Sequence, residues 1–183
     1  DNDIPMITPD LATCENCQKE LTNENNRRFK HPFISCVDCG PRYTIIDTLP
    51  YDRENTSMGK FDLCEECAKE YTTPSDRRCH AQTIACKNCG PKLNIPIEKA
   101  VDFLKSGKVL AIKDIGGYHF AASVDIETAV SKIREIKSRE QKPFAVMFKN
   151  LEEIKEYCFV DETEENLLTS EKPVQIKVKP AWE

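Results

Sequence analysis

Eight cysteines in the first half of the chain are the residues whose type and spacing most clearly indicate a chemistry. Their spacing reads C-x2-C-x18-C-x2-C-x24-C-x2-C-x18-C-x2-C. Two residues between paired cysteines let both sulfurs reach one tetrahedral ion at about 2.3 Å, and two such pairs about 15 to 20 residues apart are typical of zinc sites. Four thiolates leave no open coordination position, so we expect two structural zinc ions per chain. The expected ligands are Cys14, Cys17, Cys36, Cys39, Cys64, Cys67, Cys86 and Cys89.

The two four-cysteine units are copies of one another at an offset of fifty residues. RRFKHPFISCVDCGPR at 27–42 aligns with RRCHAQTIACKNCGPK at 77–92, and CENCQKE at 14–20 aligns with CEECAKE at 64–70. The duplication favours sequential sites, in which each unit binds its own ion. A swapped arrangement would join the second cysteine pair to the third. The loops of 18 and 24 residues differ in closure entropy by only about 0.3 kcal/mol, so entropy leaves both pairings open.

Other chemistries of paired cysteines fit the pattern less well. A disulfide framework is typical of secreted proteins, and no secretory leader is visible. A redox CxxC motif normally begins a helix of a thioredoxin-like unit, which four copies in a loop-rich stretch do not resemble. Gly40 and Gly90 directly follow the last cysteine of each unit, where we expect a positive φ that turns the chain around the metal.

The remaining cysteines and two of the histidines are not expected to be metal ligands. Cys79 aligns with Phe29 of the first unit, which indicates a packing position. His31 and His80 do not align with each other, so surface or packing roles are expected for both. Cys158 is the single cysteine of the second half, and its role is left open.

Length and composition limit the class of protein. The chain has 183 residues, 39% of them hydrophobic, and a net charge of −5. No apolar run approaches the roughly 20 residues of a membrane-spanning helix, and the acidic balance disfavours binding to double-stranded nucleic acid. We expect a cytoplasmic protein that does not enter a membrane. Because the chain begins at Asp1 without an initiator methionine, we expect a segment of a longer protein.

The elements that must hold these residues fall into two domains. Residues 1–93 are expected to form tandem four-cysteine zinc fingers, with units at about 11–42 and 61–92. Residues 97–183 alternate between helical and extended patterns, which indicates a partial α/β or α+β domain with a twisted sheet. The expected helices begin at Ile97, after Asp125, after Asn150 and near residue 161, and the expected extended segments are 108–113, 116–124, 142–148 and 174–178.

Three residues of the second domain carry helix-end signals. Gly107 is placed to end the first helix in a left-handed conformation. Asp125 and Asn150 are expected to be N-caps, because short polar side chains accept hydrogen bonds from the free N–H groups of the first turn. The apolar run at 108–113 indicates a buried strand.

A cationic stretch, KSREQKP at 137–143, is the most chemically suggestive part of the second domain. It places Lys137, Arg139 and Lys142 between a predicted helix end and a predicted strand. Cations complement the helix dipole there, and they could also bind a polyphosphate. From spacing alone, a solvated helix end is the better interpretation.

The assembled motifs resemble those of the HypF family, the carbamoyltransferases of NiFe-hydrogenase maturation. The matching segments are ITPDLATCENC, the paired RR and CxxCGP units, YDRENTSMGKFDLCEEC, RRCHAQ, KDIGGYHFAASV and KSREQKPFAVM, which span nearly all of residues 4–148. The resemblance implies the zinc-finger region of that family followed by the truncated start of its YrdC-like domain. It also implies that these 183 residues alone have little or no catalytic activity.

The family resemblance further implies an ATP-dependent reaction and a protein partner. Carbamoyl phosphate would be hydrolysed to carbamate, and the YrdC-like domain would adenylate carbamate with ATP, with magnesium expected. The carbamoyl group would then pass to the C-terminal cysteine of the protein HypE, for the cyanide ligands of the hydrogenase iron.

The resemblance also assigns residues of the second domain to a nucleotide site. The K-x-R pair of the family falls on Lys137 and Arg139. The expected nucleotide-binding residues are Lys113, Lys137, Arg139 and Lys142, and the expected lining of the substrate cleft is Gly116, Gly117, Tyr118 and His119. The S-x-N element that completes such a site would lie beyond Glu183, and no catalytic residue is assigned.

A second class of function stays open from the sequence. The chain could be a zinc-ribbon module whose second half presents residues 137–142 to RNA or a protein, or part of a threonylcarbamoyl tRNA-modification system, because YrdC-like folds occur in tRNA-modifying enzymes. The acidic balance and the lack of aromatic stacking runs weaken RNA binding. In the carbamoyltransferase interpretation, the fingers are expected to act as a rigid spacer between neighbouring domains.

Overall fold

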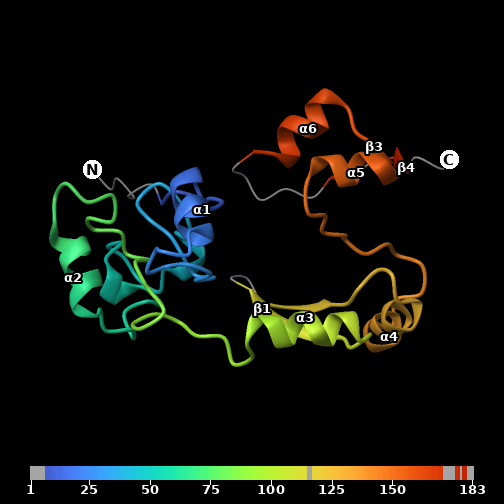
Figure 1. Cartoon of the computed structure of the whole chain (residues 1–183), viewed down its shortest axis with the longest axis horizontal. Helices are drawn as coiled ribbons and strands as arrows, with labels where there is room; N and C mark the ends of the chain where they lie inside the picture. The colour runs from blue at the N-terminus through green and yellow to red at the C-terminus, as the bar shows by residue number, and fades with distance from the viewer. Residues whose placement is uncertain (1–6, 115–116, 171–175, 178, 181–183) are drawn as a thin grey trace. The chain divides into compact units, whose positions relative to one another are not determined.

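The structure, a computed structural model, divides near Lys92 and Leu93 into two compact units. It describes residues 7–114, 117–170, 176–177 and 179–180. The first unit is the blue-to-green part of the chain in Figure 1, and the second begins in yellow-green. No described helix is long and apolar enough to cross a membrane.

The first unit contains two repeats whose helices begin in the same way. Helix α1 (Glu15–Thr22) starts directly after Cys14, and helix α2 (Glu65–Thr72) starts directly after Cys64. Both N-cap cysteines have extended backbones, with φ −69° and ψ 161° at Cys14 and φ −69° and ψ 162° at Cys64. The duplication visible in the sequence is therefore a duplication of backbone conformation.

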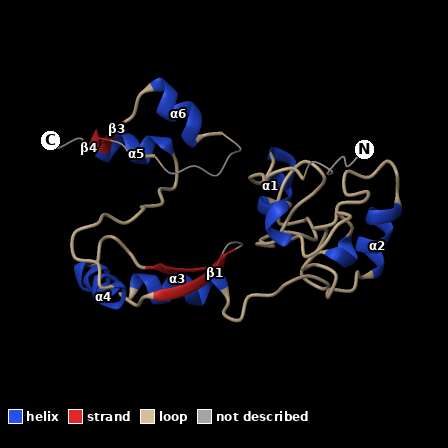
Figure 2. Cartoon of the chain, turned by 180° about the vertical axis from the view of Figure 1, so that it is seen from behind, coloured by secondary structure: helices blue, strands red, loops and turns tan. Residues whose placement is uncertain are grey.

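Loops make up most of the first unit, as Figure 2 shows. Lys30 and His80, fifty residues apart, both take a left-handed conformation with φ 53°. The segment that joins the repeats contains two short 3-10 turns, η1 (Tyr43–Ile45) and η2 (Arg53–Asn55). Regular secondary structure alone therefore does not hold the unit together.

The core of the first unit is small and is built around cysteine side chains. In each repeat one isoleucine, Ile34 or Ile84, packs against the cysteines. A third cluster joins Ile45 and Met58 of the connecting segment to Ala85 of the second repeat. Small domains with so little apolar core commonly need a metal or another cross-link to fold.

The second unit combines helices with short antiparallel strand pairs. Strand β1 pairs with β2, with Lys113 opposite Tyr118, and β3 pairs with β4, with Cys158 opposite Pro180. The elements are α3 (Ile97–Lys105), β1 (Leu110–Asp114), β2 (Gly117–Ala121), α4 (Glu127–Lys137), α5 (Leu151–Tyr157), β3 (Cys158–Phe159), α6 (Glu162–Leu168) and β4 (Lys179–Pro180). The expected fold class is confirmed: two four-cysteine units precede a mixed α and β domain.

Three helix ends of the second unit are set by local capping residues. Gly107 lies just after α3 with φ +76°, as expected. The side chain of Asn150 accepts a hydrogen bond of 2.9 Å from the Glu153 N–H and caps α5. Helix α6 begins with a capping box between Asp161 and Glu164. Each of these ends depends on one turn of backbone, and the sequence predicted those at Gly107 and Asn150.

The predicted N-cap at Asp125 is wrong. Helix α4 begins one residue later than expected, after Ile126, and no side chain caps it. The Asp125 carboxylate instead lies 3.5 Å from the Ser123 hydroxyl, which donates to it. This local contact within the preceding turn replaces the capping bond.

Two predicted strands also differ from the structure. Residues 142–148 contain no strand, because Pro143 offers no N–H and no described strand pairs with this stretch. The side chains there are not covered by a sheet, and Met147 is 97% exposed. The strand expected at 108–113 is present as β1, but it is exposed rather than buried, because a two-stranded hairpin covers neither of its own faces. Most of the strand expected at 174–178 lies outside the described residues.

Candidate metal centres

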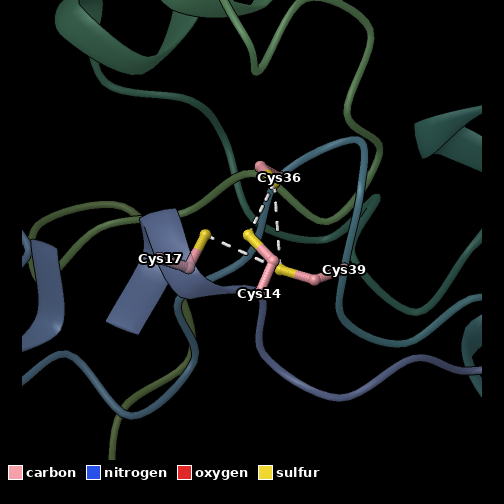
Figure 3. Close-up of side chains that lie close together, drawn as sticks. All are labelled: Cys14, Cys17, Cys36 and Cys39. Carbon is pink, nitrogen blue, oxygen red and sulfur yellow. Dashed lines mark hydrogen bonds between the residues drawn. The ribbon is translucent and has the colours of Figure 1, made fainter. Parts of the chain in front are cut away.

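The four cysteine sulfurs of the first repeat converge on one point (Figure 3). The Cys36 Sγ lies 3.7 Å from that of Cys14 and 3.8 Å from that of Cys39, which is 3.6 Å from the Cys17 Sγ. An ion bound tetrahedrally with metal–sulfur distances of about 2.3 Å requires sulfur separations of about 3.8 Å. A disulfide would need about 2.05 Å, and all four thiols are free. The group therefore has the dimensions of a tetrahedral four-thiolate site.

The second repeat contains an equivalent group formed by Cys64, Cys67, Cys86 and Cys89. The Cys86 Sγ lies 3.7 Å from both the Cys64 Sγ and the Cys89 Sγ. Within each group the ligand atoms all lie within 4.8 Å of one another. The sequential pairing favoured by the duplication is thus the pairing in the structure, and the swapped pairing is not formed.

Each site joins a helix start to a tight turn. The first cysteine of each repeat is an N-cap and the second lies in the first helical turn, so a short helix directs both sulfurs to the same side. The second pair forms a turn in which a backbone N–H donates to a cysteine sulfur at 3.4 Å, from Asp38 to Cys36 and from Asn88 to Cys86. Local geometry therefore prepares each ligand pair, and the fold brings the two pairs together.

Close packing requires both glycines after the turns, and Gly40 also has a positive φ. Gly40 has φ +91°, as expected, and a Cβ there would lie 2.7 Å from the Cβ of Ser35. The expectation of a positive φ is wrong for Gly90, which is absent from the positive-φ residues of the described chain. A Cβ at Gly90 would lie 2.5 Å from the Cβ of Ala85, so close packing explains that glycine.

Burial and mutual hydrogen bonds oppose the ionisation of several thiols in these groups. The hydrogen bond with Cys39, together with burial, raises the pKa of Cys17 to about 12, and the same hydrogen bond lowers the pKa of Cys39. Burial raises the pKa of Cys67 to about 12 and that of Cys36 to about 11. Because the thiolate is the metal-binding form, a divalent ion with affinity for sulfur supplies the charge that lets all four ligands ionise.

Sequence reasoning missed the arginines of the metal sites. Arg27 and Arg77 each donate N–H groups to cysteine sulfurs of the other repeat. The repeated RR dipeptide was a visible signal, because it is kept in both copies together with the cysteines. The sequence does not show that each pair contacts the other repeat, because those contacts join residues 37 to 61 positions apart.

The β1–β2 hairpin brings two of the predicted nucleotide-binding cations to one exposed face. Side chains alternate along a strand, so Tyr118 and Phe120 share a face with Lys113, the cross-strand partner of Tyr118. The Lys113 Nζ lies 5.3 Å from the centre of the Tyr118 ring, and the Lys137 Nζ, from the end of α4, lies 5.1 Å from that of Phe120. Tyr118 is 71% exposed.

The residues predicted to line the substrate cleft do not all share this face. His119 lies opposite Ile112, and its Nε2 is 3.9 Å from a carboxylate oxygen of Asp114 on the other face of the hairpin. Gly117 has φ +150°, and a Cβ at this position would meet no atom within 4 Å. Gly116 lies outside the described residues.

Arg139 and Lys142 lie in the turn that follows α4. The Arg139 guanidinium is 5.4 Å from the centre of the Phe144 ring, and Lys142 is exposed. A residue missed by sequence reasoning organises this turn: Arg134 donates N–H bonds of 3.2 Å to the carbonyl groups of Arg139, Glu140 and Lys142. Arg134 therefore holds the backbone that carries two of the predicted cations.

Comparison with known families divides the chain in the same order. Residues 13–46 and 63–95 both match the family model of the HypF finger. Residues 102–178 match the Sua5/YciO/YrdC family model, which is described as "Telomere recombination". The two finger matches include all eight cysteines of the metal centres.

Individual relatives and solved structures agree with these family matches. The chain is 52% identical over 177 residues to carbamoyltransferase HypF of Synechocystis, and the match covers 90% of the chain and 23% of the relative. It is 51% identical over 164 residues to carbamoyltransferase HypF of Rhizobium leguminosarum, and that match covers 90% of the chain and 22% of the relative. It is 42% identical to full-length HypF in a phosphate- and nucleotide-bound form, with a TM-score of 0.84 over 94% of the chain and 25% of that structure.

HypF of T. kodakarensis has the same identity of 42% and a TM-score of 0.85 over 91% of the chain and 23% of that structure. The chain thus spans about a quarter of the length of these relatives. The cysteine centres, the finger matches and the relatives lead to one conclusion: the chain belongs to the HypF family.

Proposed function

We propose that the first unit binds two structural zinc ions, one in each four-cysteine group. The observation that carries this part is the sulfur spacing of 3.6 to 3.8 Å in both repeats, which suits a tetrahedral ion. When bound, zinc supplies a cross-link between a helix start and a distant turn. Each group supplies four thiol ligands, which fill the tetrahedral coordination of the ion and leave no position for a substrate.

We further propose that the second unit forms part of an ATP site in a carbamoyltransferase. The exposed face with Lys113 and Lys137 supports this proposal, because aromatic rings below the two lysines hold the cations in place. Cations held in advance stabilise the negative charge that develops on a departing pyrophosphate at little cost in reorganisation. Magnesium is expected with the nucleotide. A solved relative with 42% identity is in a phosphate- and nucleotide-bound form.

The proposed reaction is the ATP-dependent activation of a carbamoyl group. Carbamate formed from carbamoyl phosphate attacks the α-phosphorus of ATP, the bond to pyrophosphate breaks, and carbamoyladenylate forms. The thiolate of the C-terminal cysteine of HypE then attacks the carbamoyl carbon, the bond to the phosphate of AMP breaks, and AMP leaves. We place this chemistry in the cytoplasm, where a reducing environment keeps cysteines such as the ten free ones of this chain available as thiols.

Pyrophosphate exchange into ATP tests the proposal. Because the chain spans about a quarter of its relatives, the test protein is full-length Synechocystis HypF in which the matching segment is replaced by this chain. Exchange that requires carbamoyl phosphate supports carbamoyl adenylation. Threonylcarbamoyl tRNA modification is the second candidate, because YrdC-like folds occur in tRNA-modifying enzymes and residues 102–178 match the Sua5/YciO/YrdC model. Exchange that requires threonine and bicarbonate would select it. No exchange, with the unaltered relative active, would contradict an ATP role for the chain.

A further inference from the structure

The first arginine pair, Arg27 and Arg28, lies in the first repeat but contacts the metal ligands of the second. Arg27 donates N–H groups to the Cys64 and Cys67 sulfurs at 3.4 Å, and Arg28 also donates to the Cys67 sulfur at 3.4 Å. Glu70 of the second repeat accepts ion-paired hydrogen bonds from both guanidinium groups. The pair therefore places two positive charges beside the second cysteine group.

The second arginine pair, Arg77 and Arg78, makes the reciprocal contacts. Arg77 donates two N–H groups to the Cys17 sulfur at 3.3 Å, and Arg78 donates to the same sulfur at 3.8 Å. Glu20 of the first repeat pairs with both guanidinium groups, and its contact with Arg77 is 2.7 Å long. Each cysteine group thus has its own carboxylate and the other repeat's arginines.

Backbone contacts extend the reciprocity beyond the charged groups. The Nε–H of Arg28 donates to the carbonyl of Ala85, and the Nε–H of Arg78 donates to the carbonyl of Ser35, both at 2.9 Å. Ser35 and Ala85 are equivalent under the fifty-residue offset. Contacts in which i meets j and j meets i are those of an isologous two-fold interface. The two repeats therefore pack as an approximate two-fold dimer within one chain.

Charge explains why the arginines face the cysteines. A zinc ion bound by four thiolates keeps an excess of negative charge, and Arg28 and Arg78 are only 2% and 3% exposed. A buried guanidinium is costly unless it is paired and fully hydrogen-bonded. A filled zinc site in the other repeat supplies that negative partner, and the N–H···S bonds are strengthened by charge on both sides.

We propose that the two zinc sites are completed in trans, so that Arg27 and Arg77 support metal binding in the opposite repeat and the filling of one site raises the zinc affinity of the other. The inference rests on the proposed occupancy of both sites by zinc. The coupling follows from the fold: cysteines form three of the four buried core residues of the first repeat and two of the four in the second. Because metal binding folds a unit with so little other core, an empty site no longer holds the arginine pair of its own repeat in place.

A pair of equivalent substitutions tests the trans arrangement in the 183-residue chain. Zinc stoichiometry is first measured by native mass spectrometry. The loaded chain is then exposed to EDTA and N-ethylmaleimide, and peptide mapping reports how fast each cysteine group becomes alkylated. We expect Arg27→Gln to accelerate labelling of the second group about tenfold or more, and Arg77→Gln to accelerate labelling of the first, since loss of a group that hydrogen-bonds a metal ligand typically costs about 10-fold to 100-fold in metal affinity.

Two further variants separate this effect from general destabilisation. Arg27→Lys keeps the charge but loses the planar fork, so it should accelerate release less than Arg27→Gln. Arg53→Gln removes a half-buried arginine that donates to the carbonyl groups of Gln82, Ile84 and Phe61 but to no cysteine sulfur among the described contacts. It measures general loosening of the second repeat and should accelerate labelling of the second group less than Arg27→Gln. Equal acceleration in both groups, or faster release from the substituted repeat itself, overturns the trans assignment.

The coupling has its own measurement. The double variant Cys64→Ser and Cys67→Ser removes zinc binding from the second site, and it should accelerate zinc release from the intact first site at least tenfold. Release at the wild-type rate would show that the sites are independent and would overturn the coupling. If the wild-type chain binds no zinc at all, the proposed zinc sites fail, which is a result distinct from two zinc ions without the crossed pattern.

Discussion

Replacement of His31 by leucine is expected to remove a large part of the acid sensitivity of the first unit. His31 is only 2% exposed, and its Nε2 has no hydrogen-bond partner within the described chain. Burial, followed by the nearby charges of Arg28 and Lys87, lowers the pKa of His31 from 6.5 to about 4. The imidazole is therefore neutral in the folded protein over most of the acidic range.

The sign of the effect follows from proton binding in the two states. Between pH 6.5 and about 4, the unfolded chain protonates His31 and the folded chain does not. The stabilisation is thus complete above about pH 6.5 and is lost as the pH falls towards 4. With about 1.4 kcal/mol per pKa unit, the free energy of unfolding should fall by about 2 kcal/mol between pH 7 and pH 5 from this residue alone.

Urea unfolding at pH 7 and pH 5, with saturating zinc, measures the difference. The loss of stability on acidification should be about 2 kcal/mol smaller in His31→Leu than in the wild type, while acid-driven zinc loss affects both proteins. His80→Leu is the control for the loss of an imidazole as such, because His80 is exposed whereas His31 is buried. An equal pH dependence in wild type and His31→Leu would refute the reasoning.

Three other predictions concern the core of the second repeat, the metal sites and the proposed ATP site. Ile84→Ala should lower the free energy of unfolding by about 2 to 5 kcal/mol in urea titrations, because Ile84 is fully buried against the second cysteine group; a loss below about 1 kcal/mol would contradict its core position. Chelation should remove the near-UV circular dichroism of the first unit and leave the far-UV helical signal of α3 to α6, and survival of the near-UV signal without metal would contradict structural zinc. In the full-length chimera, Lys137→Ala and Arg139→Ala should each reduce pyrophosphate exchange at least tenfold, which corresponds to about 1.4 kcal/mol of transition-state stabilisation. The control is Lys132→Ala, which replaces an exposed lysine of α4 and should not reduce exchange. Equal rates in all three variants would remove Lys137 and Arg139 from the site.

The sequence alone was sufficient for features set by neighbouring residues. The CxxC spacing and the fifty-residue repeat identified both groups of cysteines. Two thiolates of one pair can bind the same tetrahedral ion only when they lie close together in the chain, and two intervening residues allow this. The cap at Asn150 and the helix end at Gly107 were also predictable, since each depends on one turn of backbone.

Only the tertiary structure decided features that depend on distant segments. Closure entropy could not choose between pairings of the cysteine pairs, and the fold selects the sequential one. The strand predicted at 142–148 fails because a strand requires a partner, which no periodicity within the segment can supply.

The arginine pairs show the limit most clearly. The sequence contains RR twice, but nothing in a local pattern indicates that Arg27 lies beside Cys67, forty residues away. Such a contact forms only when the two repeats pack as an approximate two-fold pair, because that packing buries the guanidinium groups and obliges them to find negative partners in the opposite repeat. The sequence therefore determined the ligands of the metal centres, and the tertiary structure decided which charges surround them.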